Sequence, residues 1–153
     1  MEQRRRAYAL ASVHGSNGKV AEKLCRFYKH MIRCLGTNLF KRFAHLFCKQ
    51  TVALFKACRQ SPYLYASGIA VESLAQVQDR HDMLQHMLAE LSRVVLSLLT
   101  SLDAIRSNPD VVEDFFDFVV RYVKNCPMLL LKSPCVLHIV RLAASTLDAE
   151  HRE

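Results

Sequence analysis

The sequence contains no tryptophan, only 4 glycines and only 4 prolines. With so little glycine there is no phosphate-cradling loop, and no segment keeps the period-2 alternation of a half-buried strand. The longest apolar runs, such as residues 128–131, fall far short of the roughly 20 residues of a membrane span. The opening stretch, MEQRRRAYAL, has charge but lacks the apolar core of a signal peptide. These absences predict an intracellular, helical protein that inserts into no membrane.

Metal-binding cysteine pairs are missing as well. None of the 6 cysteines forms a C-x-x-C pair, and most sit within apolar helical patterns. His30 and Cys34 have a four-residue spacing that a metal ion could use, but no second close-spaced pair supports them. No paired acids share a helix face with a nearby histidine. We expect reduced, buried thiols, no metal, no cofactor and no enzymatic activity; a disulfide framework or a zinc site is the less favoured alternative.

Positive charge is abundant but unevenly distributed. The chain has 153 residues, 51% of them apolar and 23% charged, which is typical of one globular domain. Residues 1–60 hold 13 Lys or Arg against 2 acids, a balance of +11, whereas residues 61–153 hold 8 against 12, a balance of −4. The asymmetry predicts an acidic partner for the first part of the chain: a nucleic acid, a membrane surface or a phosphoprotein.

Much of this charge falls on one predicted helix face. Within GKVAEKLCRFYKHMIRCLG (residues 18–36), five cations lie inside an arc of about 120° at 100° per residue. We call them the basic stripe: Lys19, Lys23, Arg26, Lys29 and Arg33. The other side of the helix carries Val20, Leu24, Phe27, Tyr28, Met31 and Leu35. The pattern predicts an amphipathic helix whose polar face has one sign of charge.

Helical spacing continues along the whole chain. A capping residue precedes proline at Ser61-Pro62, Asn108-Pro109 and Ser133-Pro134, a pattern typical of helix starts. The predicted helices cover residues 19–35, 38–59, 62–77, 80–105, 109–125 and 134–147. Within the fifth, we expect Val112, Phe115, Phe116, Val119 and Val123 to be buried.

The helices group into repeating pairs. Pairs that start at Lys19, Pro62 and Pro109 are 43 and 47 residues apart, a period typical of HEAT and armadillo arrays. We therefore predict an all-α fold, an α-solenoid of about three HEAT-like antiparallel helix pairs. Residues 1–18 would be the end of a preceding repeat plus a loop. The hairpins would span 19–60, 61–106 and 107–147, followed by the start of a further helix. A closed helical bundle is the alternative.

Several stretches carry a family resemblance. They are NPDVVEDFFDFVVRYVKNCPMLLLKSPCV (108–136), SPYLYASGIAVE (61–72), STLDAEHRE (145–153) and the opening segment 22–36. Together, and in one order, they resemble the importin-β-like nuclear transport receptors (karyopherins) of the transportin-3 and importin-13 branch. The resemblance covers most of residues 18–153. The occurrence of all these stretches in the same order is more specific for the family than any one motif. It implies that the chain is a middle-to-late fragment of a longer HEAT array.

The resemblance also implies a function. Receptors of this branch carry serine/arginine-rich splicing factors from the cytoplasm into the nucleus, where Ran in its GTP form releases them. By resemblance, the basic stripe is the cargo-binding helix on the concave face and binds phosphorylated Arg-Ser repeats. Three of its positions are Lys where the family usually has Arg, so bidentate grip on phosphate is reduced. The alternatives are a helical nucleic-acid-binding or scaffold protein that uses the same face, or a membrane-surface helix. Against the first, Phe27, Tyr28 and Phe40 are expected to point into the apolar side.

Overall fold

The computed structural model describes residues 17–150, with side chains described as far as residue 147. Over this range the chain is helical and contains no strand, and none of its helices combines the length and apolarity needed to cross a membrane. The elements are α2 (Gly18–Cys58), α3 (Pro62–Leu74), the 3-10 helix η1 (Gln78–Arg80), α4 (His81–Leu98), α5 (Leu102–Arg106), α6 (Pro109–Asn125), α7 (Pro127–Leu131) and α8 (Val136–Glu150). The expected end of a preceding repeat falls almost entirely on residues 1–16, outside the described residues.

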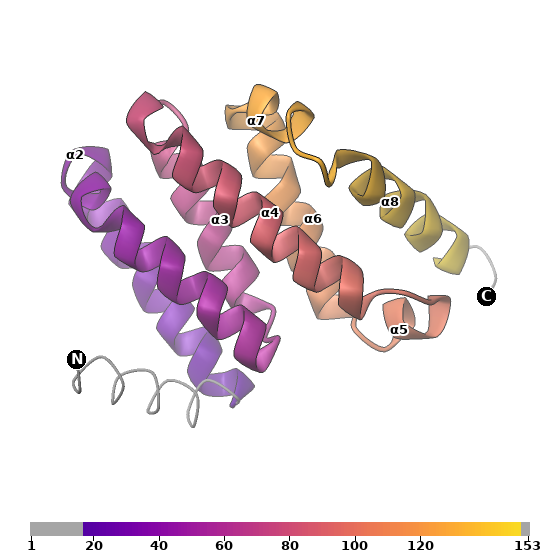
Figure 1. Ribbon diagram of the computed structural model, residues 1–153. Coiled ribbons are helices and arrows are strands. Elements are labelled where there is room, and N and C mark those ends of the chain that lie inside the picture. Colours follow the sequence, from indigo (N-terminus) through magenta and orange to yellow (C-terminus); the bar gives the residue numbers. More distant parts are fainter. Residues whose placement is uncertain (1–16, 151–153) are drawn as a thin grey trace.

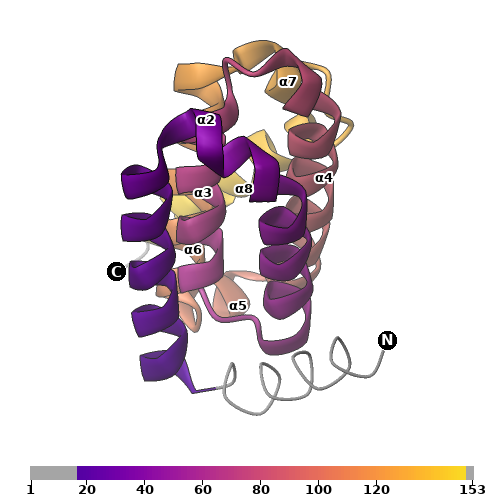
Figure 2. The same cartoon turned by 90° about the vertical axis from the view of Figure 1, so that its left-hand side faces the viewer.

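The helix α2 consists of two arms joined at Gly36. This residue has φ 61° and ψ 172°, a backbone conformation that glycine adopts without the penalty of a Cβ atom. The first arm (residues 18–35) and the second arm (residues 37–58) lie side by side (Figure 2). The ring of Tyr28 on the first arm meets the ring of Phe47 on the second edge-on, with 5.1 Å between centroids. The break lies where the sequence predicts the boundary between its first two helices.

The helices stack in two layers (Figures 1 and 2). The first arm of α2 lies with α3 and α6 in one layer, and the second arm lies beside α4 in the other. The hydroxyl of Tyr122 on α6 donates a hydrogen bond of 2.8 Å to the carbonyl oxygen of Leu84 on α4, which ties the layers together. The fully buried aromatic residues of the core are Phe40, Phe55, Tyr63, Phe115, Phe118 and Tyr122. This arrangement confirms the predicted all-α solenoid of antiparallel helices; its division at 19–60, 61–106 and 107–147 stays a prediction.

The predicted helix 80–105 is wrong at its end, because α4 stops at Leu98 and α5 begins at Leu102. Leu99 leaves the helical conformation, with φ −99° and ψ 56°. The hydroxyl of Ser101 then accepts a hydrogen bond of 3.2 Å from the backbone N–H of Ala104 and caps the new helix. The apolar period carries on through Leu102, so periodicity alone does not reveal the break.

The segment after α6 also differs from the prediction. The structure contains the short helix α7 directly after Cys126, and α8 begins at Val136 rather than at residue 134. α6 ends before Cys126-Pro127, and Pro127 occupies the first turn of α7, where its missing N–H costs no hydrogen bond. α8 contacts α4 and α5, so it extends the stack (Figure 1).

Two of the capping prolines start helices as predicted, but the capping itself differs. α3 and α6 begin at Pro62 and Pro109, and neither preceding side chain caps the helix that follows. The amide of Asn108 instead donates to the carbonyl oxygen of Ala104, at 2.8 Å. Pro therefore marks these helix starts, although the side chains of Ser61 and Asn108 do not form the capping hydrogen bonds.

The buried face of α6 is rotated from the predicted one. It consists of Val111, Phe115, Phe118, Val119 and Tyr122, whereas Val123 is 52% exposed. α3 packs closely on this face, because an added Cβ on Gly68 of α3 would lie 3.6 Å from the Cα of Phe118. Phe118 lies at this contact and is fully buried.

Candidate functional site

The basic stripe lies on the first arm of α2, on the side away from the core. Ala21, Cys25 and Ile32 bury the opposite side of the arm, with exposed fractions of 2% or less. Four of the five cations project into solvent, namely Lys19, Lys23, Arg26 and Arg33, while Lys29 is half-buried. Burial of small and apolar residues against α3 therefore fixes which face of the arm is exposed to solvent.

Two members of the stripe already have partners within the chain. Arg26 forms an ion pair with Glu22 one turn earlier, and both side chains are about half exposed. Glu22 lies within the arc of the stripe and weakens its field. The ammonium of Lys29 sits 5.8 Å from the ring centroid of Tyr65 on α3, within the range of a cation–π contact. The cations most available to an outside anion are therefore Lys19, Lys23 and Arg33.

A cavity of about 270 Å³ opens beside the stripe, where the first arm of α2 meets α3 and α6. It brings Arg26 and Lys29 together with the carboxyl groups of Glu22 and Asp114. Burial raises the pKa of Asp114, the nearby carboxylates of α6 raise it further, and a hydrogen bond with Ser61 opposes them. An anion that entered this cavity would meet two acids as well as two bases. The outward surface of the arm is thus the better anion site.

The sign of the charge changes across this layer. The guanidinium carbon of Arg121 on α6 lies 5.5 Å from the ring centroid of Tyr65, which Lys29 also contacts. Arg121 pairs with Glu72 of α3 and, at 3.7 Å, with Asp117 of α6. These acids face the α6 side, whereas the basic stripe occupies the α2 side. Anions are therefore attracted to one edge of the layer.

The aromatic residues near the stripe do not all behave as the sequence predicts. Phe40 is fully buried and Tyr28 is half-buried, in agreement with the prediction. Phe27 and Val20 were expected on the buried side, but they are 59% and 41% exposed. The described neighbours of α2 do not cover this flank of the arm. Phe27 therefore provides one exposed ring beside the cations.

No three His, Cys, Asp or Glu side chains come together as a metal site within residues 17–147. His30 and Cys34, the spaced pair in the sequence, are both exposed on the first arm. All six cysteines of the chain are free thiols. Burial raises the pKa of Cys25 and of Cys48 to about 12, so these thiols stay protonated and are poor nucleophiles at neutral pH.

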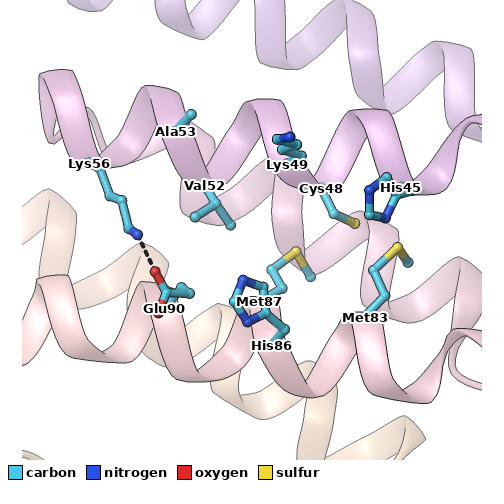
Figure 3. A pocket seen from close by; sticks show the side chains of 10 residues that line it. All are labelled: His45, Cys48, Lys49, Val52, Ala53, Lys56, Met83, His86, Met87 and Glu90. Atoms are coloured by element: carbon cyan, nitrogen blue, oxygen red, sulfur yellow. Dashed lines mark hydrogen bonds and ion pairs between the residues drawn. The ribbon is translucent and has the colours of Figure 1, made fainter.

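A second basic surface, which was not predicted from the sequence, lies on the second arm of α2. Arg42, Lys49 and Lys56 are seven residues apart and share one face of that arm, and this spacing is the signal that could have found it. Lys49 and Lys56 border a groove between the arm and α4 (Figure 3). This groove lies in the other layer from the basic stripe.

Comparisons with known proteins agree with the resemblance carried by the sequence. Residues 8–99 match the family model described as the transportin-3/importin-13 fourth TPR domain. The chain is also similar to transportin MOS14 from Arabidopsis thaliana, with 24% identity over 135 residues. That match covers 88% of this chain and 14% of the relative, so the chain spans about one-seventh of the relative's length.

Proposed function

Because the chain belongs to the transportin-3/importin-13 family of nuclear transport receptors, we propose that it is a cargo-binding segment of an import receptor. The cargo is a phosphorylated serine/arginine-rich protein of the splicing-factor type, and the basic stripe on the first arm of α2 binds it. The observation that carries this proposal is the row of exposed cations along one helix face, backed by the buried opposite face.

The spacing of the stripe suits a phosphorylated Arg-Ser repeat. Lys19 and Lys23 are separated by about 6 Å along the helix axis, at 1.5 Å per residue. In an extended Arg-Ser repeat, successive phosphoserines are separated by about 6.6–7 Å. Each phosphate adds about −1.5 to −2 charges near pH 7. An unphosphorylated repeat is strongly basic and would be repelled, so the same surface selects as well as attracts.

The individual positions differ in what they contribute. Arg33 pairs with no acid in the part of the chain that the structure describes, so its planar fork is ready for bidentate contact with phosphate. Arg26 must first leave Glu22. Lys19 and Lys23 supply charge without the fork. We therefore expect Arg33 to contribute most to recognition.

In the full-length receptor, the stripe lies on the concave face, and Ran in its GTP form releases the cargo in the nucleus. The receptor then moves between cytoplasm and nucleus. These parts of the proposal rest on family membership. The chain covers 14% of its relative. By resemblance to the family, the main Ran contact belongs to repeats elsewhere in the receptor.

Nucleic-acid binding is the second candidate function, and one observation favours it. The exposed ring of Phe27 beside Lys23 and Arg26 offers a base a stacking surface. A single ring is a small platform, because Tyr28 and Phe40 are withdrawn from solvent.

The test is a titration of a fluorescent Arg-Ser peptide, with and without its phosphates, into the chain. We expect the phosphorylated peptide to bind more tightly, and the double variant Arg26→Glu/Arg33→Glu to lose at least about tenfold in affinity. Replacement of Glu22 by Gln frees Arg26 and should strengthen binding. The matched control is Lys132→Glu/Arg141→Glu, which makes the same change of net charge just after α7 and on α8, at the other end of the stack (Figure 1). Equal affinity for both peptides, or equal losses in both double variants, would refute the assignment.

A further inference from the structure

A groove of about 400 Å³ runs between the second arm of α2 and α4 (Figure 3). Its floor is apolar and rich in sulfur: Cys48 and Val52 come from α2, and Met83 and Met87 come from α4. Cys48, Val52 and Met87 are buried, and Met83 is half-buried. Methionine side chains are flexible and polarisable, so such a floor adapts to apolar groups of different shape. The volume is within the range of sites that hold a ligand side chain or a small molecule.

The rim of the groove carries hydrogen-bond donors and positive charge. Lys49 and His45 project from α2, and His86 lies across from them on α4 (Figure 3). Lys49 is exposed and has no ion pair with an acid in the part of the chain that the structure describes. An unpaired cation above an apolar floor fits a ligand that has both an apolar group and a negative charge.

The one acid in the lining is already neutralised. Glu90 of α4 accepts from Lys56 of α2 at one end of the groove, and its second oxygen lies 2.7 Å from Arg93. The hydrogen bond from Lys56, together with the positive charges around it, holds the pKa of Glu90 below its usual value. Glu90 is therefore ionised and paired, and it leaves Lys49 without competition from within the groove.

We propose that this groove is a docking site for an acidic peptide segment of a protein partner, with one apolar side chain seated on the methionine floor. Carboxylates that flank this anchor face Lys49 and the two histidines. An acidic protein segment suits the site better than nucleic acid, because no Phe, Tyr or Trp side chain lines the groove and the two exposed imidazoles of the rim are the only rings on which a base could stack. The site belongs to the layer opposite the basic stripe, so the receptor segment would hold two acidic ligands on separate surfaces.

The experiment uses a fluorescein-labelled peptide, Asp-Glu-Asp-Leu-Asp-Glu-Asp, titrated into the full chain by anisotropy. One comparison peptide has Asn in place of the leucine, and another has Asn and Gln in place of the acids. We expect both changes to weaken binding, since the groove needs anchor and charge together. Lys49→Glu should weaken the parent peptide at least about tenfold. Arg141→Glu, with the same change of net charge on α8 and outside both proposed sites, should leave it nearly unchanged.

The floor is tested separately from the rim. Met83→Gln keeps the length of the side chain but removes its apolar character, and we expect it to abolish the preference for leucine over asparagine. Methyl NMR signals of Met83 and Met87 should shift on addition of the parent peptide. Equal losses in Lys49→Glu and Arg141→Glu would show a general charge effect and overturn the proposal. Unmoved methyl signals, displacement by single-stranded RNA or by anionic lipid vesicles, or signal changes that follow self-association of the chain would overturn it as well.

Discussion

The hydrogen bond between Tyr122 and the carbonyl oxygen of Leu84 should contribute measurably to the free energy of unfolding. The phenol is fully buried and lies 2.8 Å from its acceptor, a normal O–H···O distance. Burial raises the pKa of Tyr122 well above its usual value, so the hydroxyl is a donor at neutral pH. Tyr122→Phe removes this bond and changes the volume little. Since a buried hydrogen bond contributes about 1 kcal/mol net, the free energy of unfolding should fall by about 0.5–1.5 kcal/mol.

Tyr63 supplies the matched control. Its side chain is also fully buried, but its hydroxyl has no hydrogen-bond partner among the described residues. Tyr63→Phe removes a polar group that is desolvated without compensation, so stability should stay the same or rise. Urea unfolding followed by circular dichroism measures the free energy of unfolding of both variants. In a thermal scan, Tyr122→Phe should lower the melting temperature by about 2–4 °C. If Tyr63→Phe destabilised the protein as much as Tyr122→Phe, the interlayer hydrogen bond would have no special role.

Two further predictions concern the fold. Gly36→Ala should lower the free energy of unfolding by about 1–2 kcal/mol, because φ 61° with ψ 172° strains any residue with a Cβ. The cost comes from the backbone alone, since no atom lies within 4 Å of the added carbon. Urea titration measures the change in stability, and an unchanged unfolding midpoint would contradict the prediction. Stability should also fall as the pH rises above about 9, because burial raises the pKa of Cys25 and Cys48 to about 12, so the unfolded chain loses these protons first. Burial also raises the pKa of Cys126 to about 11 and that of Tyr63 to about 12, so replacement of Cys25 and Cys48 by Ala should reduce this dependence without abolishing it. A pH profile unaltered by that change would contradict the explanation.

Several helix boundaries could be predicted from the sequence because local chemistry decides them. Pro109 presets the backbone of the first turn, and Cys126 precedes a second proline, so the sequence predicts 109–125 for α6 and the structure agrees. Gly36 is the break between the arms because only glycine adopts its conformation readily. The end of α4 could not be predicted in this way. The apolar period continues beyond it, and the hydroxyl of Ser101 decides the start of α5.

The candidate site was partly predictable for a similar reason. Helical periodicity places Lys19, Lys23 and Arg33 on one face, and the structure exposes all three. The half-burial of Lys29 depends on Tyr65, which lies 36 positions further along the chain on another helix. Tertiary packing also determines the groove between α2 and α4, because its lining comes from two helices that lie far apart in the sequence.

The exposure of Phe27 shows where a two-sided view of a helix fails. Periodicity assigns each residue to a buried or a solvated side. In a stacked array a helix has a third flank, which faces along the stack rather than toward the core. Phe27 and Val20 on the first arm, and Phe43 on the second, are apolar and more than 40% exposed. We expect such residues wherever a repeat offers its flank to a neighbour.

The most direct test of the central claim is to map where a phosphorylated Arg-Ser peptide contacts the chain. In an NMR titration of the isotope-labelled protein, the backbone amides of residues 19–33 should shift in a saturable manner, with the largest changes near Arg33. The amides of α4 and of the second arm of α2 should stay in place, and the unphosphorylated peptide should produce no saturable shift. Shifts centred on the second arm and α4, or equal shifts with both peptides, would contradict the assignment of the basic stripe as the cargo site.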